Sequence, residues 1–214
     1  MKYAAVFFDL DGTLTESGTG IIRSFRYAFE KMEMELDPEA DLSVIIGPPL
    51  AGSFIRFGVP EERADEAVRK YRERYMTVGK YENEPYPGIR ELLQKLKEAG
   101  LKLYVATSKP ELLAVDILEH FDLAKYFDEI AGASMDGKRG TKEQVIRWLI
   151  EKADLKETAV MVGDTEFDIT GAKQTGLDGI GVTWGYGTKE SMKEAGADGL
   201  ADTMDELYTL ITAE

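Results

Sequence analysis

Two carboxylates stand close together near the start of the chain, where an apolar run ends. Asp9 and Asp11 follow the segment Tyr3–Phe8 and precede Gly12. Because side chains alternate faces along a strand, the two aspartates start out on the same side. Neighbouring carboxylates stay ionised at low cost only beside a cation, and Mg²⁺ prefers such oxygen ligands. The pair therefore predicts a magnesium site, and an ordinary Asp-rich turn is the alternative.

A second acidic cluster follows another apolar segment, Thr158–Val162. Asp164 and Asp168 are four residues apart, so they share a face if a helix begins there. Aspartate is also a favoured residue at a helix N-cap, so capping is the alternative explanation for Asp164. Capping does not account for two carboxylates on one face, and both residues are therefore candidate metal ligands.

Two hydroxyl side chains, Thr107 and Ser108, follow the apolar segment Leu101–Ala106. A hydroxyl beside the free amides of a helix start can hold a phosphate group. The alternative is a simple N-cap, with Pro110 in the first turn of the following helix. The sequence leaves both interpretations open.

Lys142 lies just inside another expected helix start. That is the unfavourable end of the helix dipole for a cation, which suggests that the lysine is needed there. A solvated lysine is the alternative, and Lys138 and Arg139 are nearby candidates for the same role.

The elements expected around these residues alternate between strands and helices. This alternation predicts an α/β fold with a parallel sheet covered on both sides. In such sheets ligands bind at the carboxyl ends of the strands, where the winding reverses, and this is where the motifs lie. The expected strands are Tyr3–Phe8, Leu101–Ala106, Glu129–Ala133, Thr158–Val162 and Gly179–Trp184. The expected helices are Pro87–Ala99, Glu111–Phe121, Thr141–Ala153, Glu166–Thr175 and Asp205–Ile211.

Residues 16–84 break the alternation because they contain helical patterns and no convincing strand. An apolar stripe at helical spacing starts at Ile21 and ends at Met32, and further helices are expected at Leu50–Phe57 and Glu61–Thr77. We therefore expect a core domain made of residues 1–15 and 85–214, with residues 16–84 inserted as a small helical domain.

Taken together, the motifs resemble those of the haloacid dehalogenase-like superfamily. The segments DLDGT at Asp9–Thr13, ATS around Thr107, Lys142 and GDTEFD ending at Asp168 occur in the order of its motifs I to IV. The resemblance spans essentially the whole chain and is closest to phosphatases of the phosphoglycolate phosphatase-like branch. It implies a three-layer Rossmann-like parallel sheet core and an inserted α-helical cap of the C1 type.

The resemblance also implies roles for the motif residues. Asp9 would be the nucleophile that forms an aspartyl-phosphate, and Asp11 would act as general acid and then as general base. Thr107, with help from Ser108 and Gly12, would bind the phosphoryl group, and Lys142 would neutralise charge on nucleophile and phosphate. Mg²⁺ would be held by Asp9, the backbone carbonyl of Asp11 and Asp164, with Asp168 close behind or bound through water.

Composition restricts the class of partner. The 214-residue chain has a formal net charge of −14, no cysteine and one histidine, His120. An acidic surface repels nucleic acids and anionic lipids, so we expect neither a nucleic-acid polymer nor a membrane as partner. No early apolar run is long enough for a signal peptide, and a cytoplasmic protein that acts on a small phosphorylated metabolite is the expectation.

The sequence leaves the substrate open. A 5'-nucleotidase or pyrophosphatase of the same superfamily is the main alternative, a phosphomutase is another, and a phosphorylatable receiver-like signalling switch is the alternative from a different class. The segment Gly47–Pro49 and the cations Arg23 and Arg56 are candidates for leaving-group selection by the cap. A monomer and a homodimer are both compatible with the sequence.

Overall fold

The computed structural model of the protein describes residues 2–134 and 138–213. The chain divides into two compact units, the first formed by Met1–Thr15 with Pro85–Glu214 and the second by Glu16–Glu84. The first is called the sheet unit below, and the second is called the insertion. Within the described residues, no helix is long and apolar enough to cross a lipid bilayer.

The sheet unit contains a six-stranded parallel sheet in the order β5-β4-β1-β6-β7-β8. This confirms the predicted α/β class and the parallel sheet. The strands are β1 (Ala5–Phe8), β4 (Lys102–Pro110), β5 (Glu129–Ala133), β6 (Ala159–Gly163), β7 (Asp178–Val182) and β8 (Gly199–Ala201). The sequence analysis did not predict β8, which extends the sheet by one short strand.

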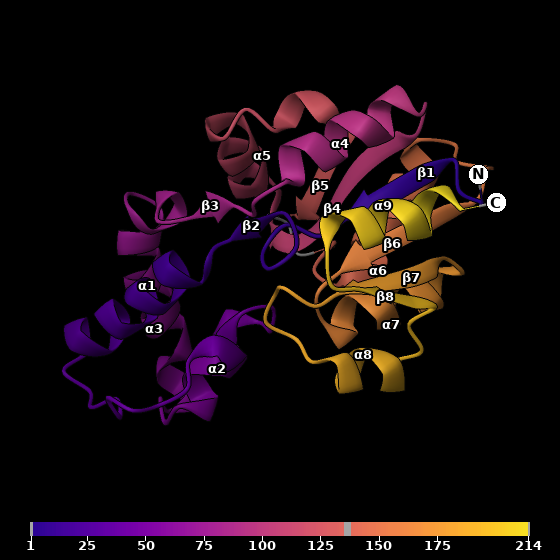
Figure 1. The fold of residues 1–214 in the computed structure, drawn as a ribbon. Coiled ribbons are helices and arrows are strands. Elements are labelled where there is room, and N and C mark those ends of the chain that lie inside the picture. The colour runs from indigo at the N-terminus through magenta and orange to yellow at the C-terminus, as the bar shows by residue number, and fades with distance from the viewer. Residues whose placement is uncertain (1, 135–137, 214) are drawn as a thin grey trace. The chain divides into compact units, whose positions relative to one another are not determined.

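Helices cover both faces of this sheet, so the sheet unit has three layers (Figure 1). The helices of the unit are α4 (Ile89–Glu98), α5 (Glu111–His120), α6 (Lys142–Lys152), α7 (Glu166–Thr175), α8 (Lys189–Glu194) and α9 (Met204–Thr212). Val6 and Phe8 of β1 belong to a core shared with α4, α5 and α9, whereas Ala5 and Phe7 belong to a second core shared with α6 and α7.

Strand β1 lies in the middle of the sheet, where the winding changes direction. Its last residue, Phe8, is in register with Val105 of β4 and with Val162 of β6. The residues that follow these three positions therefore lie at the same edge of the sheet and at a similar level. This register is what brings together motifs that are about 150 residues apart in the chain.

The insertion consists of helices α1 (Gly18–Lys31), α2 (Leu50–Arg56) and α3 (Ala64–Tyr75) with short 3₁₀ turns between them. The predicted apolar stripe of α1 is buried, and its Phe25 stacks on Phe54 of α2 with ring centroids 4.3 Å apart. Tyr71 and Tyr75 of α3 are also buried and stack on each other. An aromatic cluster thus gives the insertion a core of its own.

Two short strands mark the points where the chain leaves the sheet unit and returns to it. β2 (Thr15–Glu16) and β3 (Glu84–Pro85) pair as a separate two-stranded sheet. The two ends of the insertion are thereby held next to each other by backbone hydrogen bonds.

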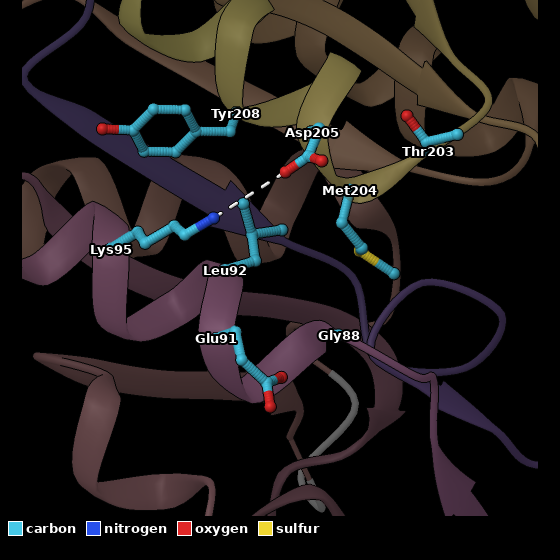
Figure 2. Close-up of a pocket in the computed structure, with 8 residues that line it drawn as sticks. All are labelled: Gly88, Glu91, Leu92, Lys95, Thr203, Met204, Asp205 and Tyr208. Carbon is cyan, nitrogen blue, oxygen red and sulfur yellow. Dashed lines mark ion pairs between the residues drawn. The ribbon is translucent and has the colours of Figure 1, made fainter.

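A cavity of about 240 Å³ lies between α4 and the start of α9 (Figure 2). Lys95 and Asp205 form an ion pair of 3.7 Å among its lining residues, and Met204 and Leu92 supply apolar surface. None of the motif residues lines this cavity, so it is distinct from the cluster described next.

Candidate active site

Lys142 is the centre of a buried ion-pair cluster at the carboxyl edge of the sheet. Its Nζ atom lies 2.6 Å from Oδ1 of Asp9 and 2.8 Å from Oδ1 of Asp168. The same ammonium donates a hydrogen bond of 2.9 Å to the carbonyl oxygen of Ala106, which directly precedes Thr107. One cation thus connects the residue after β1, the backbone of β4 and the start of α7.

The start of α6 explains why Lys142 is placed there. Thr141 caps the helix: its hydroxyl accepts a hydrogen bond from the Gln144 amide, and the Gln144 side chain accepts one from the Thr141 amide. This capping box fixes the first turn and the residue at its beginning. A Cβ atom on Gly171 of α7 would lie 2.8 Å from Cγ of Lys142, so a glycine there provides room for the lysine stem.

Asp168 is held by the first turn of α7. Its Oδ2 accepts hydrogen bonds from the backbone amide and the hydroxyl of Thr165, at 3.1 and 2.8 Å. Its other oxygen is therefore left for Lys142. The N-cap of this helix is Thr165 and not Asp164, so capping does not explain Asp164.

Asp164 is fully buried and is surrounded by backbone. Its Oδ2 accepts a hydrogen bond of 2.8 Å from the Tyr186 amide, and its Oδ1 accepts one of 3.1 Å from the Thr13 hydroxyl. A Cβ atom on Gly12 would lie 2.2 Å from Oδ2 of Asp164, and one on Gly185 would lie 2.3 Å from the same atom. Gly12 also has a φ angle of +82°, which side chains rarely adopt. Two loops thus pack glycine against this carboxylate.

The carboxylates of Asp9, Asp164 and Asp168 fit a divalent cation. Each offers one oxygen within 4.8 Å of the others, and the Lys142 ammonium ion-pairs with Asp9 and Asp168. Three negative groups against one positive group leave an excess of negative charge in a buried place. Carboxylate oxygens in this number suit Mg²⁺, so the donor set fits a divalent cation of this kind.

The protonation of these groups reflects the same charge imbalance. Burial raises the pKa of Asp9 to about 6, against the lowering effect of Lys142. Burial and the neighbouring Asp168 and Asp9 raise the pKa of Asp164 well above its ordinary value. Burial alone would lower the pKa of Lys142, but the Asp168 and Asp9 carboxylates raise it above its usual range, so the lysine stays charged.

Asp11 is placed differently from the other motif carboxylates. Its side chain does not belong to the trio that could hold a metal; its Oδ2 instead forms an ion pair of 2.8 Å with Lys109. The backbone carbonyl of Asp11, which sequence analysis assigned to Mg²⁺, stays a predicted ligand. Sequence reasoning singled out neither Lys109 nor this ion pair.

The predicted phosphate-binding residues lie in the last part of β4 and in the turn after β1. Thr107 is buried and Ser108 half-buried in the last part of β4, and the Thr107 hydroxyl accepts a hydrogen bond of 3.2 Å from the Lys109 amide. Gly12 begins the turn after β1, with its amide bound to the Thr15 carbonyl. These residues border the cluster, and their contact with phosphate stays a prediction.

The competing cations are engaged elsewhere or exposed. Arg139 forms an ion pair of 2.6 Å with Glu111 and lies over the ring of Trp148, and Lys138 is exposed. The indole nitrogen of Trp184 donates a hydrogen bond to the Thr13 carbonyl and so fixes the loop after β1.

A family model described as haloacid dehalogenase-like hydrolase matches residues 6–182, which include every residue of this cluster. The chain belongs to this family. A predicted phosphatase from Clostridium acetobutylicum has the same fold, with a TM-score of 0.91, 44% identity and 99% of each chain covered. This haloacid dehalogenase-like hydrolase is therefore a phosphatase-type enzyme of that family, as the sequence analysis predicted.

Two curated relatives carry different names. A 5'-nucleotidase of Pseudomonas aeruginosa is 42% identical over 195 residues, which are 90% of this chain and 88% of the relative. The tyrosine-protein kinase PtkA of Mycobacterium tuberculosis is 43% identical over 206 residues, which are 94% of this chain and 70% of the relative. Similar sequences in this family thus bear names for different substrates, and the substrate of this hydrolase is a separate question.

Proposed function

We propose that the protein is a Mg²⁺-dependent phosphatase that hydrolyses small phosphomonoesters through an aspartyl-phosphate on Asp9. The observation that carries this proposal is the Lys142 ammonium, buried between Asp9 and Asp168 beside the unneutralised Asp164. A carboxylate can approach an anionic phosphate only where other groups offset the repulsion between them. The cluster supplies one such cation and the ligands for a second.

The reaction is written in two displacements. An Asp9 oxygen attacks the phosphorus, the bond from phosphorus to the leaving oxygen breaks, and Asp11 gives its proton to that oxygen. A water molecule then attacks the phosphorus of the aspartyl-phosphate, Asp11 takes a proton from the water, and phosphate leaves with Asp9 restored. Splitting the hydrolysis in this way replaces one difficult displacement by two easier ones.

Asp9, Asp164 and the Asp11 carbonyl would hold Mg²⁺, with Asp168 beside them, and the bound ion would supply positive charge that offsets the repulsion between phosphate and nucleophile. Lys142 holds Asp9 in place and offsets negative charge on nucleophile and phosphate. The Thr107 hydroxyl accepts from the Lys109 amide, so its own proton can be donated to a phosphoryl oxygen. The backbone amides of Gly12 and Ser108 are the other hydrogen-bond donors that we assign to the phosphoryl group.

Phosphoglycolate-like small esters and 5'-nucleotides are the substrate classes to be tested first, because the sequence resemblance suggests the one and a 42%-identical relative bears the name of the other. We propose that the insertion acts as a cap that selects the leaving group. Arg23, one of the two cations suggested for that task, pairs with Glu82 at 2.7 Å inside the insertion, which favours Arg56 for contact with substrate.

Asp9→Asn tests the nucleophile. This variant should lose phosphate release from p-nitrophenyl phosphate and Mg²⁺ by more than about 10³-fold, because an amide cannot form the acyl phosphate. It should keep its thermal unfolding midpoint within a few degrees of the wild type. Full activity in this variant, or activity of the wild type that survives chelation of all divalent metal, would refute the proposal.

A panel of phosphometabolites, scored by phosphate release, identifies the leaving group. The panel should include phosphoglycolate, several nucleoside 5'-monophosphates, pyrophosphate and a sugar phosphate. The kinase name of one relative is tested in the same experiment by incubating the protein with ATP and a tyrosine peptide. Phosphopeptide without free phosphate would favour transfer to tyrosine, and a stable aspartyl-phosphate without turnover would favour a switch.

A further inference from the structure

Arg139 connects two parts of the sheet unit that carry residues of the proposed site. Its side chain is 12% exposed, and its Nη2 atom lies 2.6 Å from Oε2 of Glu111, the first residue of α5. Its guanidinium carbon lies 4.0 Å from the centre of the Trp148 ring on α6. The proposed reaction does not use this arginine. An ion pair that is largely shielded from water interacts more strongly than a surface pair, so it constrains the two helices that it joins.

The Glu111 end of this connection reaches the phosphate-binding segment. Glu111 directly follows β4, the strand whose last part contains Thr107. The same Oε2 of Glu111 accepts a hydrogen bond of 3.3 Å from the amide of Gly132 in β5. A Cβ atom on Gly132 would lie 2.3 Å from the carbonyl oxygen of Lys109, so a glycine there lets β5 approach this segment closely. The Glu111 side chain is thus tied to the end of β4.

The other end of the connection reaches the helix that carries Lys142. Trp148 packs, partly buried, against the core that α6 shares with the sheet. The backbone of Arg139 is also held: its amide donates to the Ser134 hydroxyl at 3.1 Å, and its carbonyl accepts from the Ser134 amide at 2.7 Å. Lys142 follows three positions later as the first residue of α6. Arg139 therefore fixes the chain just before the lysine of the site.

Apolar packing alone does not determine where α6 begins relative to β4, because hydrophobic burial is non-directional. Lys142 nevertheless needs a defined position, since its Nζ contacts two carboxylates and the Ala106 carbonyl at 2.6–2.9 Å. A charge-assisted hydrogen bond such as that from Arg139 to Glu111 is directional. It supplies a contact that fixes the start of α6 relative to the end of β4.

We propose that Arg139 is a positioning residue, which fixes the start of α6 so that the Lys142 ammonium reaches Asp9. This inference rests on the role of Lys142 in the proposed function. Lys152 of the same helix also forms an ion pair, with Glu129, but those two side chains are 48% and 34% exposed, and water screens their attraction. Misplacement of a reacting group by about 1 Å can cost about 10²-fold in rate, which sets the size of the expected effect.

The test is a double-mutant cycle between Arg139 and Lys142. Arg139→Met removes the ion pair and the cation over Trp148 while keeping an unbranched side chain, and it should lower kcat/KM for p-nitrophenyl phosphate by about 10²-fold. In a Lys142→Met background, the same change should lower the residual kcat/KM by less than about tenfold, because the group that it positions is gone. Support of the fold alone would give similar losses in both backgrounds.

Arg147→Met is the matched control, because Arg147 is an exposed arginine of α6 that pairs with Glu143 of the same helix. It makes the same charge change and should keep kcat/KM within about threefold of the wild type. Arg139→Lys should recover a large part of the activity lost in Arg139→Met, since an ammonium can still pair with Glu111. If Arg139→Met does not fold, as judged by circular dichroism, Arg139→Gln serves in its place.

A loss of less than about tenfold in Arg139→Met would overturn the inference, because α6 would then hold Lys142 in place without the arginine. A further loss of about tenfold or more in the Lys142→Met background would overturn it as well, because Arg139 would then act independently of the lysine. Either result leaves the proposed function standing, since Asp9→Asn tests that function separately in the same assay. A wild type without any Asp9-dependent hydrolysis would remove both.

Discussion

Replacing Lys142 by methionine removes the one ammonium from the carboxylate cluster while keeping most of the side-chain volume. The lysine is 6% exposed and lies 2.6 and 2.8 Å from its two carboxylate partners. At an effective dielectric constant of about 20, each pair at such a distance amounts to roughly 6 kcal/mol before the cost of desolvation. Removing one partner of a buried ion pair lowers the free energy of unfolding by about 3–5 kcal/mol.

The expected loss of activity is set separately, by the positive charge that Lys142 would supply in the transition state. Removing one preorganised electrostatic donor of this kind costs about 2.7–4 kcal/mol, or roughly 10²–10³-fold in rate. The assay is steady-state phosphate release from p-nitrophenyl phosphate at saturating Mg²⁺. Lys156→Met, which makes the same charge change at an exposed site, should keep wild-type activity.

Measuring Mg²⁺ binding to Lys142→Met distinguishes the loss of the lysine charge from a collapse of the metal ligands. Without Lys142 the three carboxylate ligands remain and no longer share their charge with an ammonium, so Mg²⁺ should still bind. At a concentration 100 times its Kd, a bound ligand stabilises the native state by about 2.7 kcal/mol. For a chain of this size that is roughly 5–11 °C in Tm.

The prediction fails in either of two ways. Lys142→Met could retain kcat/KM within about threefold of the wild type, which would mean that the ion pairs do not act in the transition state. Alternatively, the Mg²⁺-dependent rise in Tm could vanish together with activity, which would mean that the lysine maintains the geometry of the metal ligands. A large loss of activity with the metal effect preserved is the result that the structure predicts.

Gly185→Ala should lower Mg²⁺ affinity and activity together by at least about tenfold, because the new Cβ would lie 2.3 Å from a fully buried carboxylate. Its control is Gly140→Ala, where a Cβ meets nothing within 4 Å, and calorimetry of Mg²⁺ binding checks both. Glu82→Gln should destabilise the insertion by about 1–2 kcal/mol at pH 7, since the carboxylate pairs with two arginines that lower its pKa to about 2. Its folded pKa lies below the unfolded value of 4.5, so this stability is present above about pH 4.5 and is lost as the pH falls toward 2. In urea unfolding, the loss of unfolding free energy in Glu82→Gln should therefore be smaller at pH 3 than at pH 7. An equal loss at both pH values would contradict the assignment. So would the same loss in the control Glu35→Gln, which changes an exposed carboxylate.

Much of the sheet could be predicted because its central strands are continuous apolar runs. Tyr3–Phe8 and Glu129–Ala133 contain β1 and β5, and the alternation with helices correctly predicted a parallel sheet. The short strand Gly199–Ala201 was missed, because three residues without a polar–apolar rhythm carry no strand signal of their own. Its pairing with β7 is decided by tertiary packing.

The meeting of Asp9, Asp164 and Lys142 was foreseeable for a topological reason. Asp9 and Asp164 directly follow strands of a parallel sheet, and Lys142 is the first residue of a helix that begins at the same edge. In such a sheet these positions meet at the carboxyl ends of the strands. The pairing of Lys109 with Asp11 was not foreseeable. It depends on β4 running past Ala106, the expected end of that strand, to Pro110.

Contacts inside the insertion were also beyond the reach of sequence patterns. Glu82 accepts from Arg74 and from Arg23, residues 8 and 59 positions away, and only the packing of α1 against α3 brings them together. A pattern of charges along one helix does not reveal such partners, because it reports neighbours three or four residues apart.

The pairing of β2 with β3 has a consequence for how such enzymes diversify. Since the chain departs and comes back through two adjacent strands, everything between them can be exchanged at only two peptide junctions, with the reactive carboxylates left intact. With the proposed role of the insertion in selecting the leaving group, chemistry and choice of substrate would be encoded in separable stretches of the gene. A chimera that carries a relative's residues between these junctions should inherit its donor's preference while retaining the host's metal requirement.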